Sequence, residues 1–132
     1  MVSGVSEWTD RSGRRVLIVD DSPQVRQELR TLLPLAGDIE IVGEAADGLE
    51  AIRLAEALRP QVVLIDLEMP VLDGYEATRQ IKIRCPSCRV VALTVHGYEA
   101  ARQKASQAGV DVFLVKGAPL EALVRAISEQ EG

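Results

Sequence analysis

Apolar and polar residues follow two spacing patterns along this chain. Continuous runs of Val, Leu and Ile, such as residues 62–65, are typical of strands covered on both faces, as in parallel sheets. Between these runs, apolar side chains recur three and four positions apart, which is the spacing of one helix face. The pattern predicts strands at residues 15–19, 39–43, 62–66, 89–94 and 110–115.

The first helix has clear signals at both ends. Ser22 is a good N-cap and Pro23 suits the first helical position, while Pro34 and Gly37 predict the end of the helix. Its inward face is expected to consist of residues spaced i, i+4, i+7 and i+8, namely Val25, Leu29, Leu32 and Leu33.

The second helix begins at a pattern similar to a capping box, Asp47 with Glu50, and stops before Pro60. Its inward face is expected to contain Leu49, Ile52, Ala55 and Leu58. A third helix is predicted at residues 75–84, followed by a turn at residues 85–88.

The last two helices differ in how much apolar area they can bury. The predicted helix at residues 98–108, which ends at Gly109, offers mainly alanines to the core: Ala100, Ala101, Ala105 and Ala108. Because methyl groups bury little area, we expect this helix to be the least firmly docked. The final helix begins at Pro119 and has larger inward residues: Leu120, Leu123, Val124 and Ile127.

Five strands alternating with five helices predict an α/β fold with right-handed crossovers. We expect a single doubly wound, five-stranded parallel sheet of the flavodoxin-like order 2-1-3-4-5. In this order the first and third strands are neighbours, so the acids that follow them, Asp20, Asp21 and Asp66, meet at one edge of the sheet.

Composition limits the classes of function. The chain has 132 residues, is 47% hydrophobic and has a net charge of −5, which fits one globular domain without a basic surface for nucleic acid. No apolar run approaches the roughly 20 residues of a membrane span, and no signal peptide is evident, so we expect a cytoplasmic protein. Residues 1–13 are predicted to be a flexible tail, in which Trp8 is either unpacked or a contact for a partner, and residues 14–132 the domain.

Five side chains at the predicted carboxyl edge of the sheet suggest a reaction: Asp20, Asp21, Asp66, Thr94 and Lys116. Three carboxylates this close repel one another unless a hard cation such as Mg²⁺ lies between them. A metal ion, the lysine ammonium and the threonine hydroxyl could together receive a phosphoryl group. A carboxylate in line with that group would then form an aspartyl phosphate.

Each feature also has a simpler interpretation. Asp20 and Asp21 alone could cap the following helix, Thr94 could be an ordinary strand residue, and Lys116 could be a solvated charge; only their common register favours a site. His96 is interpreted as a loop residue. Cys85-x-x-Cys88 precedes a strand and has no further Cys or nearby His, so we assign it no redox or metal role and no disulfide framework.

Four of these motifs together resemble the receiver domain of two-component response regulators over residues 14–130. They are the acidic pair Asp20-Asp21, the segment from Asp66 to Gly74 with Met69-Pro70 and Asp73-Gly74, Thr94 after the fourth strand, and Lys116 after the fifth. Each follows one strand of the predicted sheet.

The resemblance implies a role for each residue. Asp66 would be the phosphoacceptor, and Asp21 would bind Mg²⁺ together with Asp66 and the backbone carbonyl of Glu68, with Asp20 holding the ion through water. The remaining residues would respond to the phosphoryl group: Thr94 would bond it, Lys116 would pair with it, and Phe113 would turn inward and repack the face of the fourth helix, fifth strand and fifth helix.

The sequence departs from the family pattern in several places. The usual Lys-Pro after the last strand is Lys116-Gly117-Ala118-Pro119, and Ala118 is a poor helix cap. Phe113 lacks the hydroxyl of a tyrosine. Glu68 and His96 stand at the variable positions that tune dephosphorylation in the family.

As a receiver, the chain would be a phosphorylation-dependent switch that phosphorylates its own aspartate and dephosphorylates slowly, rather than a multiple-turnover enzyme. Its donor would be a sensor histidine kinase or a phosphotransfer protein. Its output would be an effector protein or a missing C-terminal output domain, since the ending is similar to receivers that precede helix-turn-helix domains, and phosphorylation could produce a homodimer. The alternatives are a constitutive docking module and, on fold grounds alone, a flavodoxin.

Overall fold

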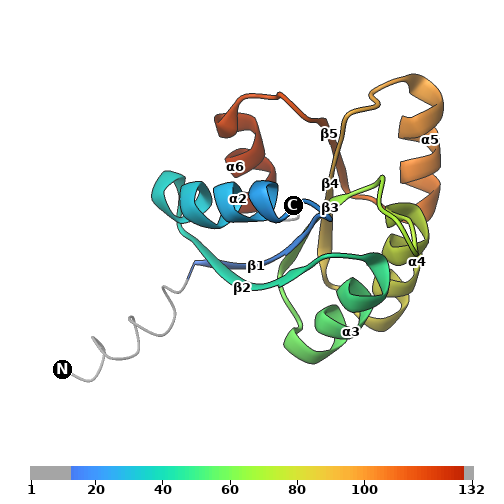
Figure 1. Cartoon of the computed structure of the whole chain (residues 1–132), viewed down its shortest axis with the longest axis horizontal. Helices are drawn as coiled ribbons and strands as arrows, with labels where there is room; N and C mark the ends of the chain where they lie inside the picture. The colour runs from blue at the N-terminus through green and yellow to red at the C-terminus, as the bar shows by residue number, and fades with distance from the viewer. Residues whose placement is uncertain (1–12, 130–132) are drawn as a thin grey trace.

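The structure is a computed structural model that describes residues 13–129, and Figure 1 shows its arrangement. The predictions for residues 1–12, including Trp8, lie outside this range. Five parallel strands form one sheet in the order β2-β1-β3-β4-β5, which confirms the predicted fold class. The strands are β1 (Arg14–Val19), β2 (Ile39–Ala45), β3 (Val62–Asp66), β4 (Arg89–Thr94) and β5 (Val112–Val115).

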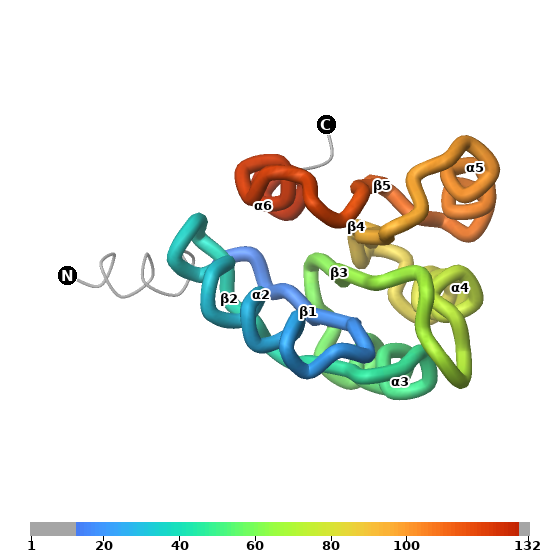
Figure 2. Tube along the Cα trace, turned by 45° about the horizontal axis from the view of Figure 1, so that its top comes forward, coloured from blue at the N-terminus to red at the C-terminus, as the bar shows by residue number. Residues whose placement is uncertain are grey.

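Within residues 13–129, five helices cover the two faces of the sheet, as Figure 2 illustrates. They are α2 (Pro23–Ala36), α3 (Gly48–Leu58), α4 (Gly74–Arg84), α5 (Glu99–Ala108) and α6 (Leu120–Ser128). Helices α2 and α6 lie on one face, and α3, α4 and α5 lie on the other. None of the helices described is long and apolar enough to cross a membrane.

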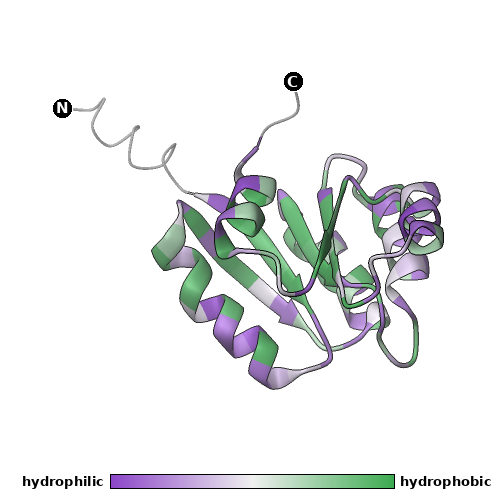
Figure 3. Cartoon of the chain, turned by 90° about the horizontal axis from the view of Figure 1, so that it is seen from above, coloured by the Kyte–Doolittle hydropathy of each residue, from purple (hydrophilic) through white to green (hydrophobic). Residues whose placement is uncertain are grey.

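Strand β3 lies at the centre of the molecule, and all five of its residues are buried. Its side chains alternate between two cores: Val63 and Ile65 pack towards α3 and α4, while Val62 and Leu64 pack towards α2 and α6. Burial on both faces explains the continuous apolar run, which Figure 3 shows as mostly green strands. The strand therefore holds Asp66, its last residue, in a fixed position.

Helix starts were predicted well from capping residues. The Ser22 hydroxyl accepts a hydrogen bond from the Val25 amide at 3.2 Å, and the Asp47 carboxylate accepts one from the Glu50 amide at 2.9 Å. Glu50 in turn accepts from the amide of Ala46 at 2.9 Å, which completes a reciprocal cap one residue earlier than in the usual box.

The inward faces of the first two helices were partly wrong. Leu32 is 45% exposed and Leu49 is 59% exposed, although both were expected to face the core. With roughly 100° between successive helical residues, Leu32 lies to one side of the stripe centred on Leu33, and Leu49 lies on the far side of the helix from Ala51 and Ala55. The spacing was correct, but the rotation of each helix about its axis was not.

Two other helix predictions need correction. Pro34 does not end α2 but lies in its last turn, and Gly37 is the C-cap; a proline there removes only one backbone hydrogen bond. In α5, Ala101 and its two partners Ala105 and Ala108 are buried, but Ala100 is exposed. Gly109 ends α5 with φ of 106°, a left-handed conformation that favours glycine.

The segment between α4 and β4 is a turn, as predicted, and its two cysteines are bonded to each other. Cys85 and Cys88 form a disulfide with their Cα atoms 5.5 Å apart. The sequence predicted neither a disulfide framework nor a redox or metal role for this pair, and it did not predict this bond. Their spacing alone could not distinguish a plain turn from a bridged one.

Candidate functional site

Three charged side chains meet where β1, β3 and β5 end. The Lys116 ammonium nitrogen lies 3.2 Å from Asp20 Oδ2 and 3.2 Å from Asp66 Oδ2, so one cation joins two carboxylates from different strands. The side chains of Asp20 and Asp66 are only 4% and 6% exposed. The predicted strand order is what brings these residues together.

The backbone orients both carboxylates in the same way. The amide of Ser22 donates to Asp20 Oδ1 at 2.9 Å, and the amide of Glu68 donates to Asp66 Oδ1 at 2.9 Å. In each case the amide belongs to the residue two positions further along the chain. The remaining oxygen, Oδ2, is thereby directed towards Lys116.

Burial dominates the electrostatics of Asp66. Loss of solvent raises the pKa of its carboxyl above the ordinary value, although the Glu68 amide and the charge of Lys116 act in the opposite direction. For Lys116, burial would lower the pKa, but the charges of Asp66 and Asp20 outweigh it and raise the pKa. At Asp66, the charge of Lys116 and the Glu68 amide thus do not fully offset the cost of burying the carboxylate, whereas the two acids favour the protonated form of Lys116.

Asp21 completes an acidic cluster. It is exposed, and one carboxylate oxygen each from Asp20, Asp21 and Asp66 lie within 4.8 Å of one another. Three carboxylates close together, one of them raised in pKa by burial, are a donor set suited to a hard cation that prefers oxygen ligands. The residues present therefore fit a divalent metal ion.

The loop after β3 approaches Asp66 closely. A Cβ atom on Gly74 would lie 2.6 Å from the carbonyl oxygen of Asp66, so only glycine fits at the start of α4. The Gly74 amide donates to the Leu67 carbonyl at 3.0 Å. Asp73, which was predicted only as part of a turn, caps α4 by accepting from the Glu76 amide at 2.9 Å.

Thr94 is fully buried at the end of β4, and its hydroxyl is engaged by Glu68. Thr94 Oγ1 donates to Glu68 Oε2 at 3.1 Å and accepts from the His96 amide at 3.2 Å. His96 Nδ1 also contacts the same oxygen of Glu68. The sequence indicated that His96 is a loop residue and, through the family resemblance, that it shares a tuning role with Glu68, but it did not predict this three-residue link.

Phe113 lies on β5, away from the acidic cluster. Its ring is half-buried against the core beneath α3, α4 and α5, and the Arg102 guanidinium of α5 lies 4.8 Å from the ring centroid. The structure thus gathers Asp20, Asp21, Asp66 and Lys116 into one cluster, with Thr94 and Glu68 beside it. Their functional roles stay predictions.

The family of the chain follows from comparison with known sequences. The profile of the response regulator receiver domain matches residues 16–128, so the chain belongs to that family. It is 35% identical over 114 residues to the nitrate/nitrite response regulator protein NarL of Escherichia coli (strain K12), an alignment that covers 86% of this chain and 53% of NarL. The chain therefore spans about half the length of such relatives.

Solved structures agree with this assignment. The signal receiver domain of NarL from Mycobacterium tuberculosis superposes with a TM-score of 0.83 and 33% identity, covering 88% of this chain and 94% of that one. A chain of the CheX–CheY–BeF3–Mg²⁺ complex from Borrelia burgdorferi gives a TM-score of 0.79 and 27% identity, with 86% of each chain covered. These similarities confirm the resemblance stated from the sequence motifs.

Proposed function

We propose that this receiver domain, over residues 14–132, is a phosphorylation-dependent switch in which Asp66 is the phosphoacceptor. The observation that carries the proposal is the geometry of Asp66: a buried carboxylate, oriented by a backbone amide, with Lys116 at its second oxygen. Burial raises the pKa of this carboxyl, and carboxyls perturbed in this way cluster at functional sites.

The donor would be the phosphohistidine of a sensor histidine kinase or phosphotransfer protein. An Asp66 oxygen forms the new P–O bond while the P–N bond of the donor breaks, and the released imidazole takes up a proton. Lys116 would pair with the oxygens of the arriving phosphoryl group, and the 3.2 Å between its ammonium nitrogen and Asp66 Oδ2 supports this role. The product is an aspartyl phosphate that the domain hydrolyses slowly.

Asp20, Asp21 and Asp66, with the backbone carbonyl of Glu68, would hold Mg²⁺. When bound, the ion would neutralise charge on the transferred group. The cluster of three carboxylates supports this assignment, as does the similarity to a chain of the CheX–CheY–BeF3–Mg²⁺ complex of Borrelia burgdorferi. Asp21, which is exposed, would bind the ion directly together with Asp66 and the Glu68 carbonyl, and Asp20 would hold it through water.

The switch would begin at Thr94. Its hydroxyl would leave Glu68 to bond the phosphoryl group, and Phe113 would then repack the face formed by α5, β5 and α6. The small inward side chains of α5 support this step, because a helix that buries only methyl groups is cheap to move. Before Asp66 is phosphorylated, Glu68 accepts a hydrogen bond from Thr94 and contacts His96. These two residues would therefore tune how readily the Thr94 hydroxyl moves.

The output would be a change in this face that controls an effector protein or an output domain outside this sequence, and a homodimer is a further form that phosphorylation would favour. We place the domain in the cytoplasm, where its kinase would act.

The acceptor is tested with Asp66→Asn. Incubation with Mg²⁺ and a small acyl phosphate should add one phosphoryl group to the wild type, seen by intact-mass spectrometry, and none to the variant. Asp38→Asn, an exposed acid before β2 at the opposite end of the sheet, is the matched control and should behave as the wild type. Wild-type uptake by Asp66→Asn would exclude this residue as the acceptor.

The competing function is a constitutive docking module with the same fold. Saturation with beryllofluoride and Mg²⁺ should shift the NMR signals of Thr94, Phe113 and the α5-β5-α6 face if the domain switches. Shifts confined to residues around Asp66 would instead favour the docking module.

A further inference from the structure

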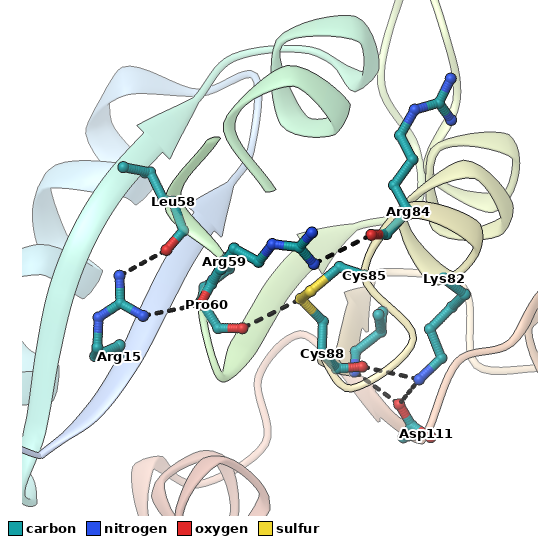
Figure 4. The surroundings of a disulfide bond; sticks show 10 residues. Arg15, Leu58, Arg59, Pro60, Lys82, Arg84, Cys85, Cys88 and Asp111 are labelled. Carbon is teal, nitrogen blue, oxygen red and sulfur yellow. Dashed lines mark hydrogen bonds and ion pairs between the residues drawn. A yellow bond between two sulfur atoms is a disulfide. The ribbon is translucent and has the colours of Figure 1, made fainter. Parts of the chain in front are cut away.

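The Cys85–Cys88 pair lies in the turn between α4 and β4, outside the site proposed for phosphorylation (Figure 4). Cys85 is 1% exposed and Cys88 is 0% exposed. The two residues between them, Pro86 and Ser87, are exposed. The sulfur atoms therefore lie beneath a two-residue surface turn, and a reagent would reach them through local opening of that turn.

The backbone holds the two cysteines together independently of the sulfur–sulfur bond. The Cys85 amide donates to the Ile81 carbonyl at 2.7 Å and ends α4, and the Cys88 amide donates to the Cys85 carbonyl at 3.0 Å across the turn. Beyond the turn, Lys82 Nζ donates to the Cys88 carbonyl at 2.8 Å and to Asp111 at 2.9 Å. The Cα separation of 5.5 Å is within the usual range for a disulfide, so either oxidation state fits the same turn.

The surroundings also accommodate the reduced form. Cys88 Sγ lies 3.1 Å from the carbonyl oxygen of Pro60, which precedes β3. A disulfide sulfur carries no hydrogen and cannot donate to this oxygen, whereas a thiol can. The same pocket thus offers a hydrogen-bond acceptor to a Cys88 thiol and a bonding partner, Cys85, to an oxidised sulfur.

We propose that Cys85 and Cys88 form a reversible dithiol–disulfide centre that exchanges with small-molecule disulfides. One cysteine thiolate attacks a sulfur of the external disulfide RSSR, forming a mixed disulfide and releasing RS⁻. The second cysteine thiolate attacks the protein sulfur of that mixed disulfide, closes the Cys85–Cys88 bond and releases the second RS⁻. The two thiol protons leave with the two RS⁻ groups as RSH, so the pair is oxidised by two electrons and RSSR is reduced by two.

The closed bond would act as a clamp between the end of α4 and the start of β4. It restricts the unfolded chain over a four-residue segment, and the loop-entropy relation gives a rise in melting temperature of about 7 °C on oxidation. This inference does not depend on phosphorylation, since neither cysteine contacts the acidic cluster.

The exchange is tested on the native protein with oxidised glutathione, followed by denaturation and alkylation with iodoacetamide. Wild-type protein reduced beforehand should lose both alkylation sites and its mass should fall by two hydrogens, and dithiothreitol should restore them. Retention of both free thiols, or a stable glutathione adduct on either cysteine, would overturn the proposal.

The clamp is tested by comparing the melting temperatures of oxidised and reduced wild-type protein. Cys85→Ala and Cys88→Ala are matched controls, because each removes one sulfur and should abolish the difference between oxidising and reducing conditions. Equal melting temperatures for the two wild-type forms would show that the bond closes without clamping the fold. Since the wild type alone carries this comparison, the result stands even if a variant folds poorly.

Discussion

The two ends of the sheet carry charges of opposite sign, with arginines at the amino ends of the strands and acids at the carboxyl ends. At the amino ends of the strands, Arg15 of β1 donates to the carbonyls of Leu58 and Arg59 at 2.7 and 2.8 Å, where α3 ends (Figure 4). Arg14 of the same strand donates to the Ile127 carbonyl of α6 at 3.2 Å. Basic groups at helix C-termini are favourable, because carbonyls there lack partners within the helix.

At the carboxyl ends, acids gather with one lysine. Asp20 and Asp66 are buried, and burial raises the pKa of Asp66. At the amino ends, Arg14 and Arg15 find hydrogen-bond acceptors within the chain. At the carboxyl ends, three carboxylates carry more negative charge than the single ammonium of Lys116 can balance. The comparison sets an end where arginines pair with helix carbonyls against an end with unbalanced acids, whose charge the proposed Mg²⁺ would neutralise.

The largest expected effect is that of Lys116→Met. Removing the ammonium that bridges Asp20 and Asp66 should destabilise the domain by about 2 kcal/mol at pH 7, a discounted value because the lysine is partly exposed. Urea unfolding measures this, with Lys116→Arg as the charge-conserving control. Saturating Mg²⁺ should stabilise Lys116→Met more than the wild type, because the variant has lost a positive charge beside the three carboxylates. An equal gain in the two proteins would contradict this account of the cluster.

The same substitution has a signed dependence on pH. The folded-state pKa of Lys116 is raised above its ordinary value of 10.5. The contribution of the ammonium to stability is therefore complete below that pH and is lost as pH rises through the folded-state pKa. The stability difference between wild type and Lys116→Met should be constant near neutrality and shrink only in alkaline solution.

Arg15→Met tests the opposite end of the sheet. It removes two charge-assisted hydrogen bonds to the end of α3, and should destabilise the domain by about 1 kcal/mol, since part of the side chain is exposed. Arg15→Lys should recover part of this loss. Mg²⁺ should change the stability of this variant and of the wild type equally; preferential stabilisation of Arg15→Met would break the distinction between the two ends.

Asp66→Asn should stabilise the domain, by about 1 kcal/mol at pH 7. Because the folded-state pKa of Asp66 is raised from 3.8, the folded protein holds this proton more tightly than the unfolded chain. Its contribution to stability therefore falls as pH rises from 3.8 through the folded-state pKa. The advantage of the variant should be small at pH 4 and larger at pH 7, as measured by urea unfolding at both values.

The smallest effect is expected for Glu68→Gln. Loss of the carboxylate weakens the hold on Thr94 and removes a negative charge near the incoming anionic donor, so phosphorylation by an acyl phosphate should be about fivefold faster. Stopped-flow or quench measurements with Mg²⁺ would show this. Glu40→Gln, an exposed acid on β2, is the control; a slower rate for Glu68→Gln would mean that the carboxylate assists the reaction.

The strands and the acidic cluster could be predicted because both depend on order along the chain. Continuous apolar runs marked β1, β3 and β4, and the parallel order forced Asp20 and Asp66 to one edge. What could not be predicted depends on side-chain direction. The rotation of α3 decided that Leu49 is exposed, and the link between Glu68 and His96 joins two loops whose separation no spacing rule gives.

Main-chain amides set the orientation of the two buried carboxylates: Ser22 donates to Asp20, and Glu68 donates to Asp66. Every residue except proline supplies such an amide. Replacing the side chain of Ser22 or Glu68 therefore leaves the amide donor in place, and the carboxylate of Asp20 or Asp66 keeps its direction. Proline at position 22 or 68 is the one exchange that would release the carboxylate.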